Sequence, residues 1–567
     1  MTITPSDVHQ KIRELTAEGA YFALQQVDVD GRPATAFRNA PGTLLDVLKA
    51  GRGHGGAPFV VYEGRTLSFD QFYRRADALA TTLQRVCGIK PGDRVAIAMR
   101  NSPDWSVAYV AGALIGAVLA PLNSWGKAAD LLYGIDDSGA RMLICDRERY
   151  DLLEDRLQPR QLEVVVATED ALPERAGVRS LEQAVAAGQS CDYRAAEAGP
   201  MDIAQILYTS GSTGFPKGVS TRHIAICQSL ANMLFLGMLA QSLGKQRAPV
   251  DGKTGETPLL TVPLFHATGL VAGLLLPLLL GQKVVMMYKW DTRAALELIA
   301  REKVTGITTV PTVLQALLTH PDFERHDTRS LFRVSAAGAA TPTGLAELIG
   351  TRIEGAVRST GWGMTETMAV GATMIGPIYD LNPASAGIPS PLAELRFVDV
   401  EGRELPAGQA GEIQYRGVTL CAGYWNKPDA TREALDHDWF RTGDVGYLDV
   451  DGYLHITDRI KDIVIRGGEN IYPGEIESAA YAMGTLQDVV VFGVPDTAMG
   501  EELALVACPL PGVQVDVEQL RAHLATSLAR YKVPRYLELT TEPLPQNASG
   551  KLFKRQIQKD FVARHKL

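Results

Sequence analysis

The chain has 567 residues, 46% of them hydrophobic, which is enough for several buried cores and too much for one. A formal net charge of −9 and a pI near 5.7 give no electrostatic reason to bind nucleic acid or an anionic membrane. The six cysteines lack C-x-x-C spacing, so they indicate buried free thiols rather than a disulfide framework or a zinc site.

The first half of the chain predicts an α/β fold. Residues 1–45 are polar and poorly periodic, and we interpret them as an N-terminal arm without a secretory signal. Residues 72–86 carry a helical stripe, residues 95–99 read as a strand, and residues 105–120 read as a helix. Short apolar runs separated by helices indicate mostly parallel sheets with helices on both faces. Further strands are predicted at residues 142–145, 164–166, 284–287 and 307–310.

The second half predicts smaller units. The most apolar run, residues 269–281, is 13 residues long and contains Pro277, so we expect a buried core helix, no membrane span and a cytoplasmic protein. After about residue 385, shorter alternating runs with a hairpin turn at Asp451-Gly452 indicate a small antiparallel or β-barrel-like subdomain. The last 110 residues mix strands with a helix and are domain-sized. We therefore predict a large domain at residues 1–457 and a small α+β domain at residues 458–567.

Residues 208–219 read Y-T-S-G-S-T-G-F-P-K-G-V and are the most informative segment. An apolar run precedes them and a helical pattern follows from Ile224 to Met238, so we predict strand, loop and helix. A glycine-rich loop lets backbone N–H groups approach a phosphate, and hydroxyls and Lys217 add donors and charge. No G-x-x-x-x-G-K-[ST] occurs, so this is not a Walker motif. An ordinary Gly/Ser/Thr loop is the alternative, which the hydroxyl density disfavours.

Four later segments are ambiguous when taken singly. Residues 360–367, T-G-W-G-M-T-E-T, leave room for a base on Trp362 and offer Glu366 to Mg²⁺, or they are a packed tryptophan beside a helix cap. In R-T-G-D, Asp444 suits a ribose diol, although turn aspartates are often only solvated. The segment at 458–475 and the late Lys551 also have plain surface interpretations.

The order and spacing of these segments resemble the adenylate-forming superfamily, and acyl-CoA synthetases of the AMP-binding family in particular. The resemblance covers nearly the whole chain. It implies that ATP and a carboxylic acid give an acyl-adenylate and pyrophosphate, after which a thiol takes the acyl group and releases AMP. It also implies a mobile C-terminal lid domain, with ATP, Mg²⁺ and coenzyme A as cofactors.

The same resemblance implies roles for individual residues. Lys551 would bridge the attacking carboxylate and the ribose, Glu366 would hold Mg²⁺, and Lys461 would be the hinge about which the lid rotates. Catalytic roles fall to Lys551, Thr365, Glu366 and Lys217. The nucleotide and coenzyme A contacts are Thr209, Ser210, Gly211, Ser212, Thr213, Gly214, Lys217, Gly338, Ala339, Ala340, Trp362, Gly363, Thr365, Asp444, Arg459, Lys461, Gly467, Gly468 and Lys551.

The resemblance places the acid in an apolar pocket. Its residues are His266, Thr268, Val310, Gly338 and Gly363. A core histidine is the alternative for His266. Because the pocket residues are apolar or small and no aspartate lies near His266, an apolar fatty or aryl acid fits better than an α-amino acid.

Several alternatives stay open. The acceptor is expected to be coenzyme A, since the G-G-E-N-I-Y-P-G-E-I-E run resembles CoA ligases more than peptide synthetases. A carrier-protein phosphopantetheine supplied in trans is the second option. A non-enzymatic nucleotide-binding protein is the third, and a luciferase-type oxygenase is a distant fourth. The sequence leaves a homodimer open and does not identify the acid.

Overall fold

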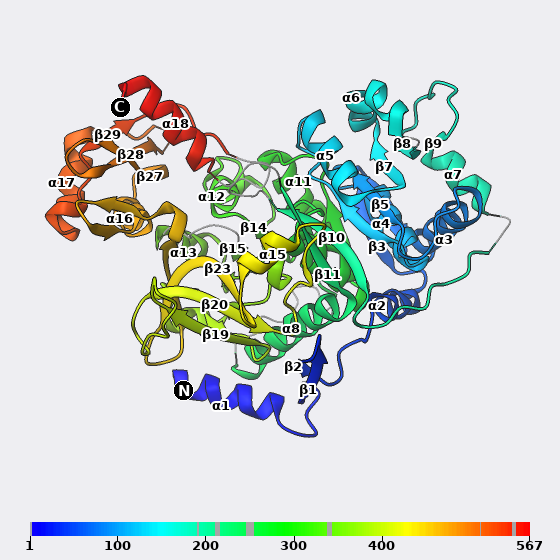
Figure 1. The fold of residues 1–567 in the computed structure, drawn as a ribbon, viewed down its shortest axis with the longest axis horizontal. Coiled ribbons are helices and arrows are strands. Elements are labelled where there is room, and N and C mark those ends of the chain that lie inside the picture. Colours follow the sequence, from blue (N-terminus) through cyan, green and yellow to red (C-terminus); the bar gives the residue numbers. More distant parts are fainter. Residues whose placement is uncertain are drawn as a thin grey trace.

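The computed structural model describes residues 3–160, 162–189, 192–209, 216–244, 255–336, 343–510, 512–546 and 552–567. Two large sheets lie in the first three quarters of the chain, a smaller sheet follows, and a separate C-terminal sheet with its helices lies to one side (Figure 1). The predicted α/β class is therefore confirmed.

The first large sheet has eight strands, parallel from β10 through β6, β5, β7 and β8 to β9. Its order is β21 (Gly423–Tyr424), β11 (Lys217–Arg222), β10 (Ile203–Thr209), β6 (Val118–Pro121), β5 (Arg94–Ala98), β7 (Met142–Asp146), β8 (Glu163–Ala167), β9 (Val178–Ser180).

The second large sheet has nine strands, six of which form a parallel centre from β16 to β3. Its order is β18 (Ile388–Pro389), β17 (Ala372–Ile375), β16 (Val357–Trp362), β15 (Arg333–Ala336), β14 (Gly306–Thr309), β12 (Pro258–Leu260), β13 (Val284–Met286), β3 (Pro58–Tyr62), β4 (Arg65–Ser68).

Helices cover both faces of both sheets because successive strand residues point to opposite sides. Val95 and Ile97 of β5 face the core between the sheets, whereas Ala96 and Ala98 face the outer helices. The inner helices are α2 (Leu44–Gly51), α3 (Phe69–Thr81), α4 (Pro103–Leu114) and α8 (His223–Ser242). The outer helices are α5 (Ala128–Ser138) and α6 (Arg147–Leu157) on one side, and α11 (Thr292–Glu302), α12 (Pro311–Thr319) and α13 (Thr343–Arg352) on the other. Shorter helices are α7 (Leu181–Gly188), α14 (Pro377–Leu381) and α15 (Pro428–Ala434).

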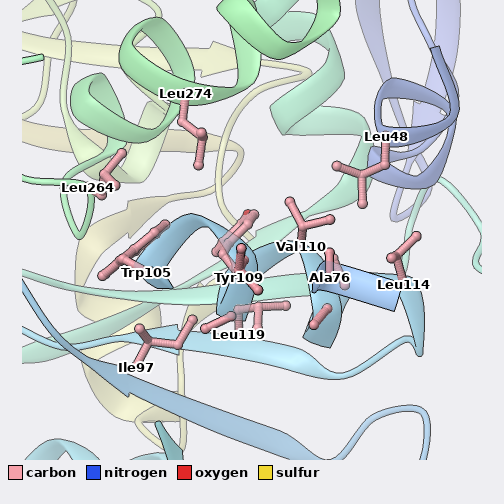
Figure 2. Close-up of a cluster of buried hydrophobic side chains, with 14 of the residues drawn as sticks. Leu48, Ala76, Ile97, Trp105, Tyr109, Val110, Leu114, Leu119, Leu264 and Leu274 are labelled. Atoms are coloured by element: carbon pink, nitrogen blue, oxygen red, sulfur yellow. The ribbon is translucent and has the colours of Figure 1, made fainter. Parts of the chain in front are cut away.

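The main core lies where α4 packs between the sheets. Figure 2 shows Trp105, Tyr109 and Val110 of α4 above Ile97 and Leu119 of the first sheet, with Leu264 and Leu274 approaching from the opposite side. All of these side chains are fully buried. This core fixes the carboxyl ends of the strands that carry the candidate site.

The predicted core helix at 269–281 is confirmed as a continuous helical segment. It consists of α9 (Ala267–Leu270), one wide turn at Val271–Leu275 and α10 (Leu276–Leu280). Within the described residues, only α8 is long and apolar enough to cross a membrane, and 67% of its most apolar window is buried inside the fold. Because most of this window is buried against the rest of the protein, α8 is a core helix of the fold.

Two predictions about local structure are wrong. The glycine-rich loop does not run from strand into helix, because β11 intervenes and pairs antiparallel with β10 before α8 begins. The helix predicted at 105–120 ends at Leu114, since Gly116 turns the chain with a φ of 75° into β6. The N-terminal arm forms an ordered element.

That N-terminal element combines a helix and a hairpin. It contains α1 (Pro5–Thr16), β1 (Leu24–Val29) and β2 (Arg32–Phe37). Asp7 and Thr4 form a reciprocal capping box that starts α1. Phe22 and Phe37 bury their rings against Phe235 of α8, with centroids 5.5 and 5.4 Å away. The isolated aromatic residues gave no periodic signal, so the sequence did not reveal this packing.

The small subdomain is an antiparallel five-stranded sheet. It contains β19 (Ala393–Val398), β20 (Gly411–Gly417), β23 (Trp439–Leu448), β22 (Leu435–Asp436) and β24 (Leu454–Arg459). The predicted Asp451-Gly452 hairpin joins β23 to β24.

The C-terminal sheet shares no strand with the others within the described ranges. It contains β25 (Val464–Arg466), β26 (Glu469–Ile471), β27 (Leu486–Asp496), β28 (Gly500–Pro509) and β29 (Tyr536–Leu539), with α16 (Pro473–Tyr481), α17 (Val517–Ser527) and α18 (Lys554–His565). A domain boundary at 457/458 stays a prediction.

Candidate functional site

A cavity of about 1490 Å³ lies at the carboxyl ends of the parallel strands. Thr209 ends β10, Thr309 ends β14, and Gly363 follows β16, and all three line it. Arg100 and Asn123, just beyond β5 and β6, line it as well. In open α/β sheets this edge is where ligands bind, because the connecting loops are free to vary there. The strand order therefore places one site between the two large sheets.

The cavity is positively charged although the chain as a whole is acidic. Among its described lining residues, seven are Lys or Arg and three are Asp or Glu. The cations are Arg100, Lys127, Lys217, Lys289, Arg441, Arg459 and Lys461, and the anions are Asp130, Glu366 and Glu412. Such a concentration of charge in a concave site favours an anionic ligand.

The two ends of the glycine-rich loop lie opposite each other across the β10–β11 ladder. Thr209 pairs in register with Lys217, and its hydroxyl donates to the Lys217 carbonyl at 3.4 Å. Both residues line the cavity. Because the loop joins two strands, the N-terminus of α8 does not directly follow it. The predicted contacts between them, Ser210, Gly211, Ser212, Thr213 and Gly214, lie outside the described residues.

Asp137 holds the start of this loop. Its carboxylate accepts hydrogen bonds from the Tyr208 hydroxyl at 2.9 Å and the Tyr133 hydroxyl at 3.1 Å. It also pairs with the Lys427 ammonium at 2.9 Å, and its side chain is only 9% exposed. Tyr208 precedes the loop and Lys427 follows β21, so one carboxylate on α5 ties both segments together.

Thr365 and Glu366 lie on a short 3₁₀ turn at Thr365–Thr367, and both line the cavity. The Tyr424 hydroxyl donates to the Glu366 carboxylate at 2.9 Å, and the Cys421 N–H donates to the Glu366 carbonyl at 2.7 Å. The Lys217 ammonium lies 4.7 Å from the Tyr424 ring centroid. Burial raises the pKa of Glu366, while hydrogen bonds and nearby cations oppose that rise. The structure thus brings Lys217 and Glu366 to one wall through Tyr424.

Trp362 and Asp444 meet just behind the cavity wall. The Trp362 indole N–H donates to Asp444 Oδ2 at 2.7 Å, and Arg459 Nε contacts Asp444 Oδ1 at 2.9 Å. The Asp444 side chain is 4% exposed. Arg459 and Gly363 line the cavity, whereas Trp362 and Asp444 are not among its lining residues. In this arrangement both Asp444 oxygens already have partners.

The C-terminal segment closes one side of the cavity. Lys461, in the middle of the 3₁₀ turn Ile460–Asp462 after β24, lines the cavity together with Gln546 and Phe553. Burial, and then the neighbouring Arg459, lower the pKa of Lys461. Lys551 lies outside the described residues, between Gln546 and Phe553 in the chain.

The Gly467-Gly468 pair is not part of the cavity lining. Both glycines have positive φ angles, 58° and 87°, in the turn from β25 to β26. Their predicted contact with the substrate thiol stays a prediction.

The apolar end of the cavity contains three of the predicted pocket residues, His266, Thr268 and Val310. Burial lowers the pKa of His266 to about 4, so its imidazole is neutral at pH 7. Its ring makes no hydrogen bond to the described residues, which leaves it available to the cavity. The remaining apolar lining includes Leu260, Val262, Pro263, Ala267, Met287, Trp290, Val313 and Ala369. Gly338, Ala339 and Ala340 lie outside the described residues.

Sequence reasoning missed Tyr424, Asp137 and the aromatic end of the cavity at Arg100 and Trp125. Tyr424 reaches Glu366 because β21 pairs with β11, a contact between residues about 200 positions apart. Asp137 meets Tyr208 and Lys427 through folding alone. No local pattern indicates either contact.

The chain matches the family model for the AMP-binding enzyme over residues 48–425 and that for the AMP-binding enzyme C-terminal domain over residues 475–551. It is 34% identical over 506 residues to a feruloyl-CoA synthase from Amycolatopsis sp, covering 89% of this chain and 96% of that protein. It is 32% identical over 512 residues to the fatty acid–[acyl-carrier-protein] ligase ScoC from Streptomyces coeruleorubidus, covering 89% and 93%.

A solved structure is also similar along almost the whole chain. The anthranilate CoA ligase AuaEII in complex with anthranoyl-AMP superposes with a TM-score of 0.81 at 26% identity, covering 93% of this chain and 98% of that one. The cavity geometry and these matches agree with the order of motifs. The chain therefore belongs to the AMP-binding enzyme family, and it is an AMP-forming acid–thiol ligase of the adenylate-forming superfamily.

Proposed function

We propose that this enzyme joins an apolar fatty or aryl carboxylic acid to coenzyme A through an acyl-adenylate, with release of AMP and pyrophosphate. The observation that carries the proposal is that one cavity contains both the Lys217–Glu366 wall and the apolar pocket around His266. A carboxylate attacking the α-phosphate of ATP is an anion meeting an anion, and the excess of cations in the lining offsets that repulsion.

Individual roles follow from position. Lys217 and Thr209, with the loop between them, would bind the distal phosphates, and Thr365 would contact the α-phosphate. Arg459 would contact the nucleotide from the cavity side. Asp444 lies behind the lining, and its two carboxylate oxygens are paired with Trp362 and Arg459. A contact between Asp444 and the ribose would therefore require Arg459 to shift.

Glu366 fits a magnesium ion that also carries substrate phosphates. Mg²⁺ in nucleotide sites is commonly held by one or two carboxylates together with phosphate oxygens, and Glu366 is a cavity carboxylate beside Thr365. The described residues contain no group of three or more potential His, Cys, Asp or Glu ligands. The ion would neutralise phosphate charge.

The acid would lie against His266, Val310 and the apolar lining. A neutral His266 can accept or donate one hydrogen bond without adding a charge to the pocket. No aspartate lies among the described lining residues of the apolar end, where a substrate ammonium would need one. This favours an acid without an α-amino group.

The first experiment is an acid panel scored by pyrophosphate release, with and without coenzyme A. Aryl and fatty acids are expected to give release, whereas α-amino acids are expected to stay at background. Pyrophosphate release at background for every acid would instead support a non-enzymatic nucleotide-binding protein.

The second experiment separates the half-reactions. Lys551→Ala should lower adenylate formation by a factor of about 10² to 10³ while sparing thioester formation from supplied acyl-adenylate. Lys461→Pro should impair thioester formation most, because a stiff ring at the proposed hinge restricts rotation. Equal losses in both half-reactions would contradict these roles.

A carrier-protein phosphopantetheine as acceptor is the second candidate, and the similarity to ScoC favours keeping it. Competition between coenzyme A and a loaded carrier protein tests it. We also propose a cytoplasmic location, a mobile lid domain at residues 458–567 and a homodimer.

A further inference from the structure

An unpaired arginine faces the cavity away from the Lys217–Glu366 wall. Arg100 follows β5, and its guanidinium carbon lies 3.2 Å from the ring centroid of Trp125. Its Nε and Nη1 are buried and have no hydrogen-bond partner among the described residues. Burying two guanidinium donors without a partner costs free energy, and an anion bound at the cavity side of the guanidinium would offset part of that cost.

Asp146 and Glu148 favour the charge of Arg100 through space, but neither forms an ion pair with its side chain. Arg149 pairs with Asp146 at 2.9 Å and with Glu148 at 3.0 Å. From Arg100, Asp146 accepts a hydrogen bond only from the backbone N–H, at 3.0 Å, and none from the guanidinium. The tyrosine hydroxyl of Tyr288 donates to Glu148 at 2.9 Å. The direct ion pairs of these two acids therefore go to Arg149, and the Arg100 guanidinium has no ion-pair partner among the described residues.

The surroundings extend this positive charge. Lys127 and Lys289, which are close in the chain to Trp125 and Tyr288, also line the cavity. The one acidic lining residue close to them in the chain, among the described residues, is Asp130. Asp130 is already engaged, since it accepts the Lys127 backbone N–H at 2.9 Å. The local excess of cations indicates an anion with more than one charge.

This end of the cavity opens to solvent. Trp125 and Tyr288 are 40% and 39% exposed, unusually high for large aromatic rings. Asn101, next to Arg100, donates to the Val262 carbonyl at 3.0 Å and accepts from the Leu264 N–H at 2.9 Å, which ties this end of the cavity to the segment before His266. Exposed aromatic faces beside an unpaired guanidinium are suited to a base and its phosphate.

We propose that Arg100, stacked on Trp125, binds the 3′-phosphate at the nucleotide end of free coenzyme A. The inference rests on the proposed acyl-CoA ligase function and deepens it. The pantetheine arm would then run from this mouth into the cavity, while the adenosine stays at the surface near Trp125 and Tyr288. A carrier-borne phosphopantetheine has no adenosine 3′-phosphate, so this contact selects free coenzyme A over a carrier protein.

The test compares three thiols: coenzyme A, dephospho-coenzyme A, which lacks only the 3′-phosphate, and pantetheine. Arg100→Met keeps the length that packs on Trp125 and removes the charge. We expect the KM for coenzyme A to rise about 10- to 100-fold with kcat nearly unchanged. We expect KM values for dephospho-coenzyme A and pantetheine to change less than twofold. Arg100→Lys should recover part of the loss, since it restores the charge but not the planar fork.

The matched control is Arg65→Met. Arg65 forms an exposed ion pair with Glu169 at 3.2 Å and is not a lining residue, so this variant loses one arginine without touching the cavity. A second measurement needs no variant: adenosine 3′,5′-bisphosphate should inhibit thioester formation by the wild-type enzyme in competition with coenzyme A, and should leave acid-dependent ATP–pyrophosphate exchange unchanged.

Two outcomes would overturn the inference. One is that Arg100→Met raises the KM for pantetheine or for the carboxylic acid as much as that for coenzyme A, which would assign Arg100 to the thiol arm or to an anionic acid. The other is that wild-type enzyme uses dephospho-coenzyme A as well as coenzyme A. Failure of the proposed function is distinct, because it would show as absent ATP–pyrophosphate exchange with every acid.

Discussion

Tyr208 offers a direct test of whether the start of the glycine-rich loop is held by Asp137. Tyr208→Phe removes one hydroxyl that donates to the Asp137 carboxylate at 2.9 Å and leaves the ring in place. Hydrogen bonds to charged groups contribute about 1.5–3 kcal/mol. Because Tyr133 and Lys427 still serve Asp137, we take the lower end, about 1.5 kcal/mol.

The consequence for activity follows from where this energy acts. Tyr208 lies immediately before Thr209, so the lost bond frees the end of β10 from which the loop departs. If the bond serves to place the loop, the KM for ATP should rise by up to about tenfold, the equivalent of 1.4 kcal/mol. The assay is ATP–pyrophosphate exchange at saturating acid, together with urea denaturation of the same preparations.

Tyr133→Phe is the matched control. Its hydroxyl donates to the same carboxylate at 3.1 Å, but Tyr133 lies on α5, four residues before Asp137, and does not adjoin the loop in the chain as Tyr208 does. Both variants should therefore lose similar stability, while only Tyr208→Phe should raise the KM for ATP. Equal changes in the KM for ATP, or none in either variant, would refute the role of Asp137 as a holder of the loop.

Two further predictions concern the pocket histidine and the core. The pKa of His266 lies near 4 in the fold and near 6.5 when unfolded, so the unfolded chain binds the extra proton and stability falls as pH drops from about 6.5 to 4. His266→Gln should show a smaller decrease in melting temperature between pH 6.5 and 4.5 than the wild type, and an identical decrease would exclude His266 as a contributor. Trp105 is fully buried and stacked on Tyr109, with ring centroids 5.4 Å apart, so Trp105→Ala should destabilise the first unfolding transition by about 3–5 kcal/mol in urea. A loss below about 1 kcal/mol would mean that the core around α4 collapses into the space.

The sequence predicted those parts of the fold that have a local signal. The strands β5, β7, β8 and β14 appear as short apolar runs because both faces of a parallel sheet are buried. The hairpin at Asp451-Gly452 followed from turn chemistry. In contrast, β11 was missed, because its residues after Lys217 lack a long apolar run and gain their pairing from β10 and β21.

The candidate site divides in the same way. Lys217, Thr365, Glu366 and Arg459 could be selected from the sequence because short motifs restrict their residue types. The pairing of Trp362 with Asp444 could not, since it depends on how β16 and β23 approach each other.

By itself, the sequence determined the superfamily and the α/β class, and it predicted a set of phosphate-binding residues, because glycines, hydroxyls and charges in fixed local order are typical of that chemistry. Only the tertiary structure decided that the loop joins two strands, that Asp137 and Tyr424 support its ends, and that Arg100 is left without a partner beside Trp125. The physical reason is that each of these features is a contact, or a missing contact, between distant segments. Hydrogen bonding and desolvation depend on distances in space, which neighbouring residues in the chain do not fix.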